Sequence, residues 1–135
     1  MSLLVVGTVA FDAIETPFGK RDKIIGGSAT YIGLSASYFY KKIKLVSVVG
    51  SDFPKATIAQ FNKKGINTDG IEVIKGKKSF FWSGRYHMDM NTRDTLVTDL
   101  NVLADFNPVL PAASRKPDFL MLGNIEPSLQ IKVIE

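Results

Sequence analysis

Four short apolar segments of the chain have the pattern of buried β-strands. They are Leu3–Val6, Leu45–Val49, Gly70–Ile74 and Phe119–Leu122. Short runs dominated by valine, leucine and isoleucine are typical of strands that are covered on both faces, as in parallel sheets.

Segments with helical features lie between and after these strands. Small and aromatic residues recur at helical spacing from Ala29 to Tyr40, which predicts one helix. After the second strand, Ser51 or Asp52 is suited to cap a helix that Gly65 ends. A third helix is predicted over Pro127–Glu135. Because strands and helices alternate, we expect an α/β fold with a mostly parallel sheet flanked by helices.

The stretch Ser79–Val102 has a different pattern. It is rich in aromatic residues, threonine and valine, and it lacks a helical period. We predict two or three antiparallel strands here, with the turn at Met88–Asp94. The alternating segment Phe11–Ile14 predicts an edge strand or a hairpin that leads into a turn, and the proline-rich segment Phe106–Pro117 predicts a loop.

Composition and charge narrow the classes of function. The 135 residues, 45% of them hydrophobic, are enough for one modest domain with a core. The net charge of +4 comes from scattered small groups of basic residues, which argues against nucleic-acid binding and favours an anionic small molecule. We find no signal peptide and no apolar run near the roughly 20 residues of a membrane span. The absence of cysteine excludes disulfides and is compatible with a cytoplasmic protein.

Two features are candidates for ligand binding. Asp12 lies just past the carboxyl end of the first predicted strand, where open α/β sheets bind ligands and where a carboxylate is suited to accept hydrogen bonds from a polyol. Spacing alone favours a solvated turn or a cap for this residue. Gly26, Gly27 and Ser28 precede a predicted helix, so the backbone can approach a ligand, and free amide groups there bind oxygen-rich ligands. A simple turn explains the two glycines equally well.

The predicted hairpin holds further polar residues. His87 is the only histidine, and a lone histidine in an aromatic strand is more often a surface residue than a base. Asp89 alone does not make a metal site, so none is predicted. Arg85 and Arg93 either reach a ligand or form cross-strand ion pairs. The chain also lacks the GxGxxG, Walker and GxSxG motifs.

Combined, the motifs resemble those of the ribokinase-like (PfkB) carbohydrate kinase family. The segments LLVVGTVAFDAI, IIGGSATYIGLSASYF, KLVSVVGSDFP and FNKKGINTDGIEVIKG follow one another in that family's order and spacing. VVGSDFP is similar to its VGxDxxG step, with Pro54 as a variant, and KKGINTDGI is similar to its xxGVDTxxV segment. FLMLGNIEPSL resembles the strand and turn that close the substrate side. The resemblance covers essentially the whole chain.

This resemblance implies a fold and a set of site residues. Residues 1–135 would be the N-terminal part of a ribokinase-like domain, with a small antiparallel β lid built from residues 11–16 and 79–102. Asp12 would bind substrate hydroxyls, and the backbone of Gly26 and Gly27 would lie against the sugar. Departures from the ribokinase pattern leave the substrate open. They are Ala10 and Tyr31 in place of asparagines, Ser28 in place of a lysine, and Asn124 in place of a glutamate.

The lid is expected to carry Trp82, Arg85 and Arg93. Trp82 and Phe80 would pack against the substrate site, against a second lid in a homodimer, or simply within the sheet.

The implied reaction is transfer of the ATP γ-phosphoryl group to a hydroxyl of a sugar or nucleoside, with Mg²⁺. The GAGD-type segment that carries this family's catalytic base does not occur in these residues, so we assign no catalytic residue. We therefore expect an incomplete domain that is inactive alone, with the ATP and Mg²⁺ sites mainly in a missing C-terminal half. The alternative is a non-catalytic, kinase-like module that binds a ligand, or a partner through its lid.

Overall fold

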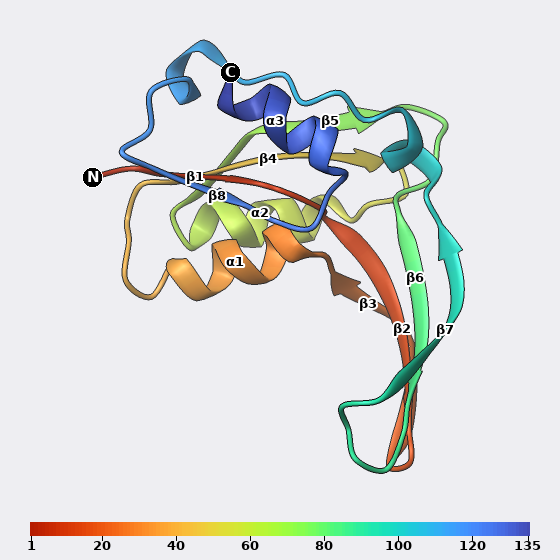
Figure 1. Cartoon of the computed structure of the whole chain (residues 1–135). Coiled ribbons are helices and arrows are strands. Elements are labelled where there is room, and N and C mark those ends of the chain that lie inside the picture. Colours follow the sequence, from red (N-terminus) through yellow and green to blue (C-terminus); the bar gives the residue numbers. More distant parts are fainter.

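The computed structural model describes residues 1–135 as two four-stranded sheets with three α-helices (Figure 1). The first sheet is wholly parallel and has the strand order β5-β4-β1-β8. Its strands are β1 (Leu3–Val6), β4 (Ile43–Gly50), β5 (Ile66–Ile74) and β8 (Phe119–Leu122). These strands include the four segments that were predicted from their apolar runs, so the prediction of these four strands is confirmed.

The second sheet, which we call the lid sheet, extends away from one end of the parallel sheet (Figure 1). Its strands are β2 (Ala10–Thr16), β3 (Gly19–Gly26), β6 (Phe81–Tyr86) and β7 (Arg93–Asp99), in the order β3-β2-β6-β7. The β2–β3 and β6–β7 pairs are antiparallel, whereas β2 and β6 are parallel. The lid sheet is therefore mixed rather than wholly antiparallel as predicted.

Helices cover both faces of the parallel sheet. Helices α1 (Ser28–Ala36) and α2 (Lys55–Lys63) lie on one face, and α3 (Pro127–Ile134) lies on the other (Figure 1). Two short 3₁₀ helices, η1 (Asn101–Asp105) and η2 (Ala112–Ser114), lie in the connection from the lid sheet to β8. The α/β fold class is thus confirmed. No helix has the length and apolarity needed to cross a membrane.

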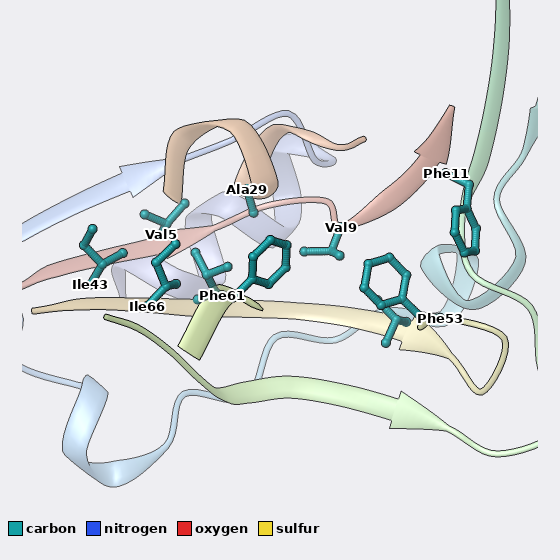
Figure 2. Close-up of a cluster of buried hydrophobic side chains, with 10 residues drawn as sticks. Val5, Val9, Phe11, Ala29, Ile43, Phe53, Phe61 and Ile66 are labelled. Carbon is teal, nitrogen blue, oxygen red and sulfur yellow. The ribbon is translucent and has the colours of Figure 1, made fainter. Parts of the chain in front are cut away.

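Each face of the parallel sheet has its own hydrophobic core. Because side chains alternate along a strand, Val5 and Leu45 face α1 and α2 and pack with Phe61, in the cluster drawn in Figure 2. Leu4 and Val46 point to the opposite face, where they belong to a cluster with buried residues of η1 and α3. The two cores account for the uninterrupted apolar runs, since both faces of these strands are buried.

One aromatic pair joins the first core to the lid sheet. The rings of Phe11 on β2 and Phe53 before α2 have centroids 5.4 Å apart and an interplanar angle of 36°. Figure 2 shows them at the end of the cluster that lies toward the lid strands. Both side chains are buried, so the base of the lid sheet is packed against the parallel layer.

The structure settles one open sequence-based prediction and differs from two others. The segment predicted as an edge strand or a hairpin is a hairpin: β2 is an inner strand, and β3, with four charged residues, is the exposed edge strand that pairs along it. Helix α1 ends at Ala36 rather than Tyr40, since the chain turns there and exposes Tyr38 and Phe39. Strand β8, predicted as buried, exposes the side chains of Phe119–Met121 because it forms an edge of the parallel sheet.

Neither Ser51 nor Asp52 is the cap of α2, although the sequence suggests one of the two. The N-cap position of α2 is Pro54, and no side chain caps this helix. Instead, the Asp52 carboxylate accepts hydrogen bonds from the backbone N–H of Ser79 at 2.8 Å and from its hydroxyl at 2.7 Å. The Ser79 Oγ in turn accepts the N–H of Gly50 at 2.9 Å. Asp52 therefore fastens the carboxyl end of β4 to the segment that enters β6.

We expect Asp52→Ala to destabilise the protein by about 1–3 kcal/mol, because it leaves the buried N–H and hydroxyl of Ser79 without their acceptor. Chemical denaturation monitored by circular dichroism measures this change. The matched control is Asp105→Ala, which removes an exposed carboxylate paired only with Lys77 and should change the free energy of unfolding by less than about 0.5 kcal/mol. Equal effects of the two substitutions would contradict the fastening role of Asp52.

Candidate functional site

A pocket of about 420 Å³ lies where the parallel sheet meets the lid sheet. The carboxyl ends of β1 and β8, the first residues of β2 and the start of α1 form its polar floor. The floor residues are Thr8, Asp12, Gly27, Ser28 and Asn124. The remaining lining comes mostly from the lid sheet: Tyr31, Phe80, Trp82, Tyr86, Arg93 and Thr95. The pocket thus lies at the edge of the sheet where open α/β folds bind ligands.

The Ser28 hydroxyl holds the floor together. Its oxygen accepts the N–H of Thr8 at 3.2 Å and the N–H of Asn124 at 3.1 Å. A Cβ on Gly7 would lie 2.7 Å from this oxygen, and a Cβ on Gly123 would lie 2.4 Å from it. Only glycine at both strand ends therefore leaves room for the serine, which links β1, β8 and α1.

The hydrogen bonds around Ser28 also orient the proton of the Thr8 hydroxyl. The Thr8 Oγ1 accepts the N–H of Ser28 at 2.9 Å and lies 3.2 Å from the Ser28 Oγ. The Ser28 oxygen already accepts two N–H groups, which use its two lone pairs, so its own proton is the one that lies between the two hydroxyls. The Thr8 hydroxyl then keeps its proton for another acceptor. Because Thr8 lines the pocket, a ligand can be that acceptor.

The first amide groups of α1 are not free, contrary to our expectation for a helix start that binds a ligand. Thr8 accepts the N–H of Ser28 through its side chain and the N–H of Ala29 through its carbonyl oxygen, both at 2.9 Å. Gly27, with φ 96° and ψ 147°, has a backbone conformation close to one that essentially only glycine adopts. A Cβ there would lie 2.4 Å from the Thr8 carbonyl oxygen. Gly27 thus allows Thr8 to cap the helix.

Asp12 is a half-buried carboxylate that accepts no hydrogen bond from the protein. Burial raises its pKa above the ordinary value of 3.8, because desolvation disfavours the charged form. Space for the carboxylate comes from Gly26 on the neighbouring strand β3. A Cβ at residue 26 would lie only 2.0 Å from the Asp12 Oδ2. The site therefore holds an acceptor whose partner the protein does not provide.

The structure brings most of the predicted site residues together. Asp12, Gly27, Ser28, Tyr31, Trp82, Arg93 and Asn124 all line the pocket. Gly26 contributes through the space it leaves for Asp12. Phe80 also lines the pocket, beside Trp82.

Arg85 and His87 lie outside the pocket lining. Arg85 forms a cross-strand ion pair with Glu15 at 2.8 Å, which was one of the two alternatives for it. His87 lies 2.9 Å from the carboxylate of Asp94 and is exposed.

Sequence reasoning missed three lining residues: Thr8, Tyr86 and Thr95. Two of them had a local signal. Thr8 directly follows the glycine that ends the first strand, where a polar side chain faces the ligand edge. Tyr86 follows Phe80 and Trp82 at even spacing, which places it on the same face of the strand. Thr95 had no local signal in the sequence, because its position in the pocket depends on how β7 pairs with β6.

No family model matches the chain. Over 77 residues, it is 31% identical to a cytidine kinase of Thermococcus kodakarensis, an alignment that covers 57% of this chain and 27% of that protein. Among solved structures it is similar to a nucleoside kinase of Methanocaldococcus jannaschii, described as an archaeal member of the ribokinase family. That match has a TM-score of 0.74 and 17% identity, over 98% of this chain and 48% of the other.

The ribokinase of Cryptococcus neoformans in complex with ADP gives a TM-score of 0.69 at 17% identity, over 97% of this chain and 43% of the other. The chain has a ribokinase-like fold. It spans about half the length of these solved structures, and its aligned segment covers about a quarter of the cytidine kinase. The resemblance read from the sequence motifs is thereby confirmed at the level of the fold.

We expect Asp12→Asn to stabilise this ribokinase-like chain at neutral pH, because it removes the desolvation of a charge. A raised folded-state pKa means that the native state binds the proton more tightly than the unfolded state. The stability of the natural sequence therefore falls as pH rises from 3.8 through the raised value, whereas Asp12→Asn lacks this fall. Thermal melts from pH 3 to pH 7 should show the two melting temperatures diverging by a few degrees.

The control for this comparison is Asp22→Asn, which changes an exposed carboxylate on the adjacent strand β3. Its melting temperature should not diverge in this way. A variant Asp12→Asn that is less stable than the natural sequence at pH 7 would contradict the proposed cause.

A second expectation concerns Gly26→Ala. The added methyl group occupies the position of the Asp12 carboxylate, so that carboxylate must move toward the open pocket and regain water. The pKa of Asp12 should then fall toward its ordinary value. Carboxyl ¹³C NMR titration measures this pKa, and the spectrum of Asp12→Asn identifies the resonance. An unchanged pKa in Gly26→Ala would show that Gly26 does not provide the space for this side chain.

Proposed function

We propose that residues 1–135 form the substrate-binding side of an ATP-dependent kinase that phosphorylates a hydroxyl group of a sugar or nucleoside. The observation that carries this proposal is the half-buried Asp12 carboxylate, which has no hydrogen-bond donor within the protein and faces a pocket at the ligand edge of a ribokinase-like fold. Kinases that share this fold, including a nucleoside kinase and a ribokinase, support the reaction class.

The chemistry of the floor suits a ligand with neighbouring hydroxyl groups. The Asp12 carboxylate accepts from two hydroxyls at once, since each carboxylate oxygen has free lone pairs. The Thr8 hydroxyl donates its free proton to one of the same oxygens. A hydroxyl group both donates and accepts, so the pair of Asp12 and Thr8 matches it better than it matches a purely anionic or purely cationic group. Asn124 offers a further amide side chain at the same edge.

The role of this chain in the reaction is to position the accepting hydroxyl. ATP, when bound, supplies the γ-phosphoryl group, and phosphoryl transfer depends mainly on alignment and on charge stabilisation around the phosphates. We assign no residue to Mg²⁺ because the chain brings together no cluster of three or more acidic or histidine side chains. We propose that the phosphate donor binds to parts of the kinase fold that these residues do not include.

Ligand binding to the 135-residue chain tests the proposal. Thermal-shift and calorimetric titrations with sugars and nucleosides should identify a ligand that stabilises the chain. Asp12→Ala should weaken that ligand at least tenfold, since a hydrogen bond to a charged group is worth about 1.5–3 kcal/mol. The matched control Asp22→Ala, on the same β2–β3 hairpin but outside the pocket, should leave the affinity unchanged.

Phosphoryl transfer is measured separately, by ³¹P NMR with ATP, Mg²⁺ and the ligand so identified. A longer kinase that contains residues 1–135 should phosphorylate the ligand, and residues 1–135 alone should not exceed the uncatalysed background. Binding without transfer by such a longer protein would favour the non-catalytic module instead. Affinity that survives Asp12→Ala would overturn the assignment of the substrate site.

A further inference from the structure

The two sides of the pocket differ in chemistry. The floor is polar, with Asp12 and Thr8 as its unpaired acceptor and donor. Beside it, Phe80, Trp82 and Tyr86 form what we call the aromatic wall. Trp82 and Tyr86 lie four positions apart on β6, and Phe80 lies two positions before Trp82, directly ahead of the strand, so the three side chains lie on the same face of the lid sheet.

The floor and the aromatic wall meet at one pair of neighbouring residues. In the parallel pairing of β2 with β6, Asp12 lies directly opposite Trp82. Directly paired residues of adjacent strands point to the same face, so the carboxylate and the indole stand side by side. A ligand that places hydroxyl groups on Asp12 therefore extends its next group over the aromatic wall.

The indole of Trp82 is held in a fixed place. Gly84, two residues further along β6, lets the ring lie over the strand, since a Cβ there would be 2.1 Å from the Cη2 atom of the ring. The Nε1–H donates to the Thr95 Oγ1 on β7 at 3.3 Å. The Nε1–H of the ring is hydrogen-bonded and its edge packs against Gly84. The apolar surface of the ring that remains is partly exposed in the pocket.

We propose that the substrate is a nucleoside, with its ribose hydroxyls on the polar floor and its base stacked on the aromatic wall. This inference rests on the proposed function of the floor as a hydroxyl-binding site. A bare sugar uses the floor but leaves the wall in contact with water, whereas a planar base covers it. Stacking of a base on an aromatic side chain contributes enough to raise affinity roughly 5- to 150-fold.

Trp82 provides a direct readout, because it is the only tryptophan in the chain. Cytidine and inosine, titrated into the 135-residue chain, should change the tryptophan fluorescence and bind at least fivefold more tightly than methyl β-riboside. That riboside has the same sugar without a base and should leave the fluorescence nearly unchanged.

Substitutions separate the two sides of the pocket. Tyr86→Leu, which keeps the tryptophan probe, and Trp82→Leu, followed by calorimetry, should each weaken nucleosides at least fivefold while changing the affinity for methyl β-riboside less than twofold. Tyr38→Leu is the matched control, because Tyr38 is an exposed tyrosine outside the pocket, and it should change neither affinity. Circular dichroism melts establish that each variant is folded. Tyr86→Leu serves as the test if Trp82→Leu does not fold.

The outcomes distinguish this inference from the proposed function. If the riboside binds as tightly as the nucleosides and Asp12→Ala abolishes its binding, the nucleoside assignment is overturned and the hydroxyl site stands. If nucleosides bind tightly but Asp12→Ala has no effect, the proposed floor is overturned. If neither class of ligand binds, both are overturned.

Discussion

The contact on which the site depends is the insertion of the Ser28 hydroxyl between two glycines. Gly7 ends β1, Gly123 ends β8, and neither position has room for a Cβ beside the serine oxygen. This close approach brings two strand ends and a helix start to one point, and the N–H groups of Thr8 and Asn124 both bond to the same oxygen. Because the serine oxygen is then fully occupied as an acceptor, the proton of the Thr8 hydroxyl is left for the pocket. The close approach of Gly7, Gly123 and Ser28 thus determines where the floor lies and leaves the Thr8 hydroxyl as its hydrogen-bond donor.

The pocket also contains a group that lowers the stability of the fold. Asp12 is removed from much of its water without receiving a hydrogen bond in return, and its raised pKa records that desolvation. A protein selected only for stability would place an apolar residue or a hydrogen-bonded one at this position. The space for the carboxylate is created by the lack of a side chain at Gly26, and the space for the Trp82 ring by the lack of one at Gly84. Two glycines on two different strands therefore serve two side chains of the pocket.

The sequence predicted the parts of the fold whose signals are local. The strands of the parallel sheet were located because both their faces are covered, which leaves an apolar run such as Leu3–Val6. The sequence left open whether Phe11–Ile14 was an edge strand or part of a hairpin, because an edge strand with exposed charges such as β3 resembles a loop and its pairing with β2 is visible only in the fold. Asp52 was one of two candidate caps because serine or aspartate before a helix often is one, but Ser79, which lies 27 residues away in sequence, binds the carboxylate instead. Asp12 and the Gly26–Gly27 pair were singled out from their positions after a strand and before a helix, and the motif resemblance then implied a role for them. The spatial relation of Gly26 to Asp12 was not foreseeable, since it depends on the register of β2 with β3.

The pocket depends on the register of β2 with β6, and the contacts between the two sheets fix this register. A slip of one residue in this pairing would send Trp82 to the face opposite Asp12 and separate the polar floor from the aromatic wall. The two strands are parallel and far apart in sequence, so no hairpin turn sets their register. The register is fixed instead where β6 begins: the N–H of Phe11 donates to the carbonyl oxygen of Phe80 at 2.9 Å, and the adjacent Ser79 is bonded to Asp52. Asp52 lies at the end of the parallel sheet, so the layer that positions the floor also positions the wall. The two chemically different sides of the pocket therefore meet because both are anchored to the same edge of one sheet.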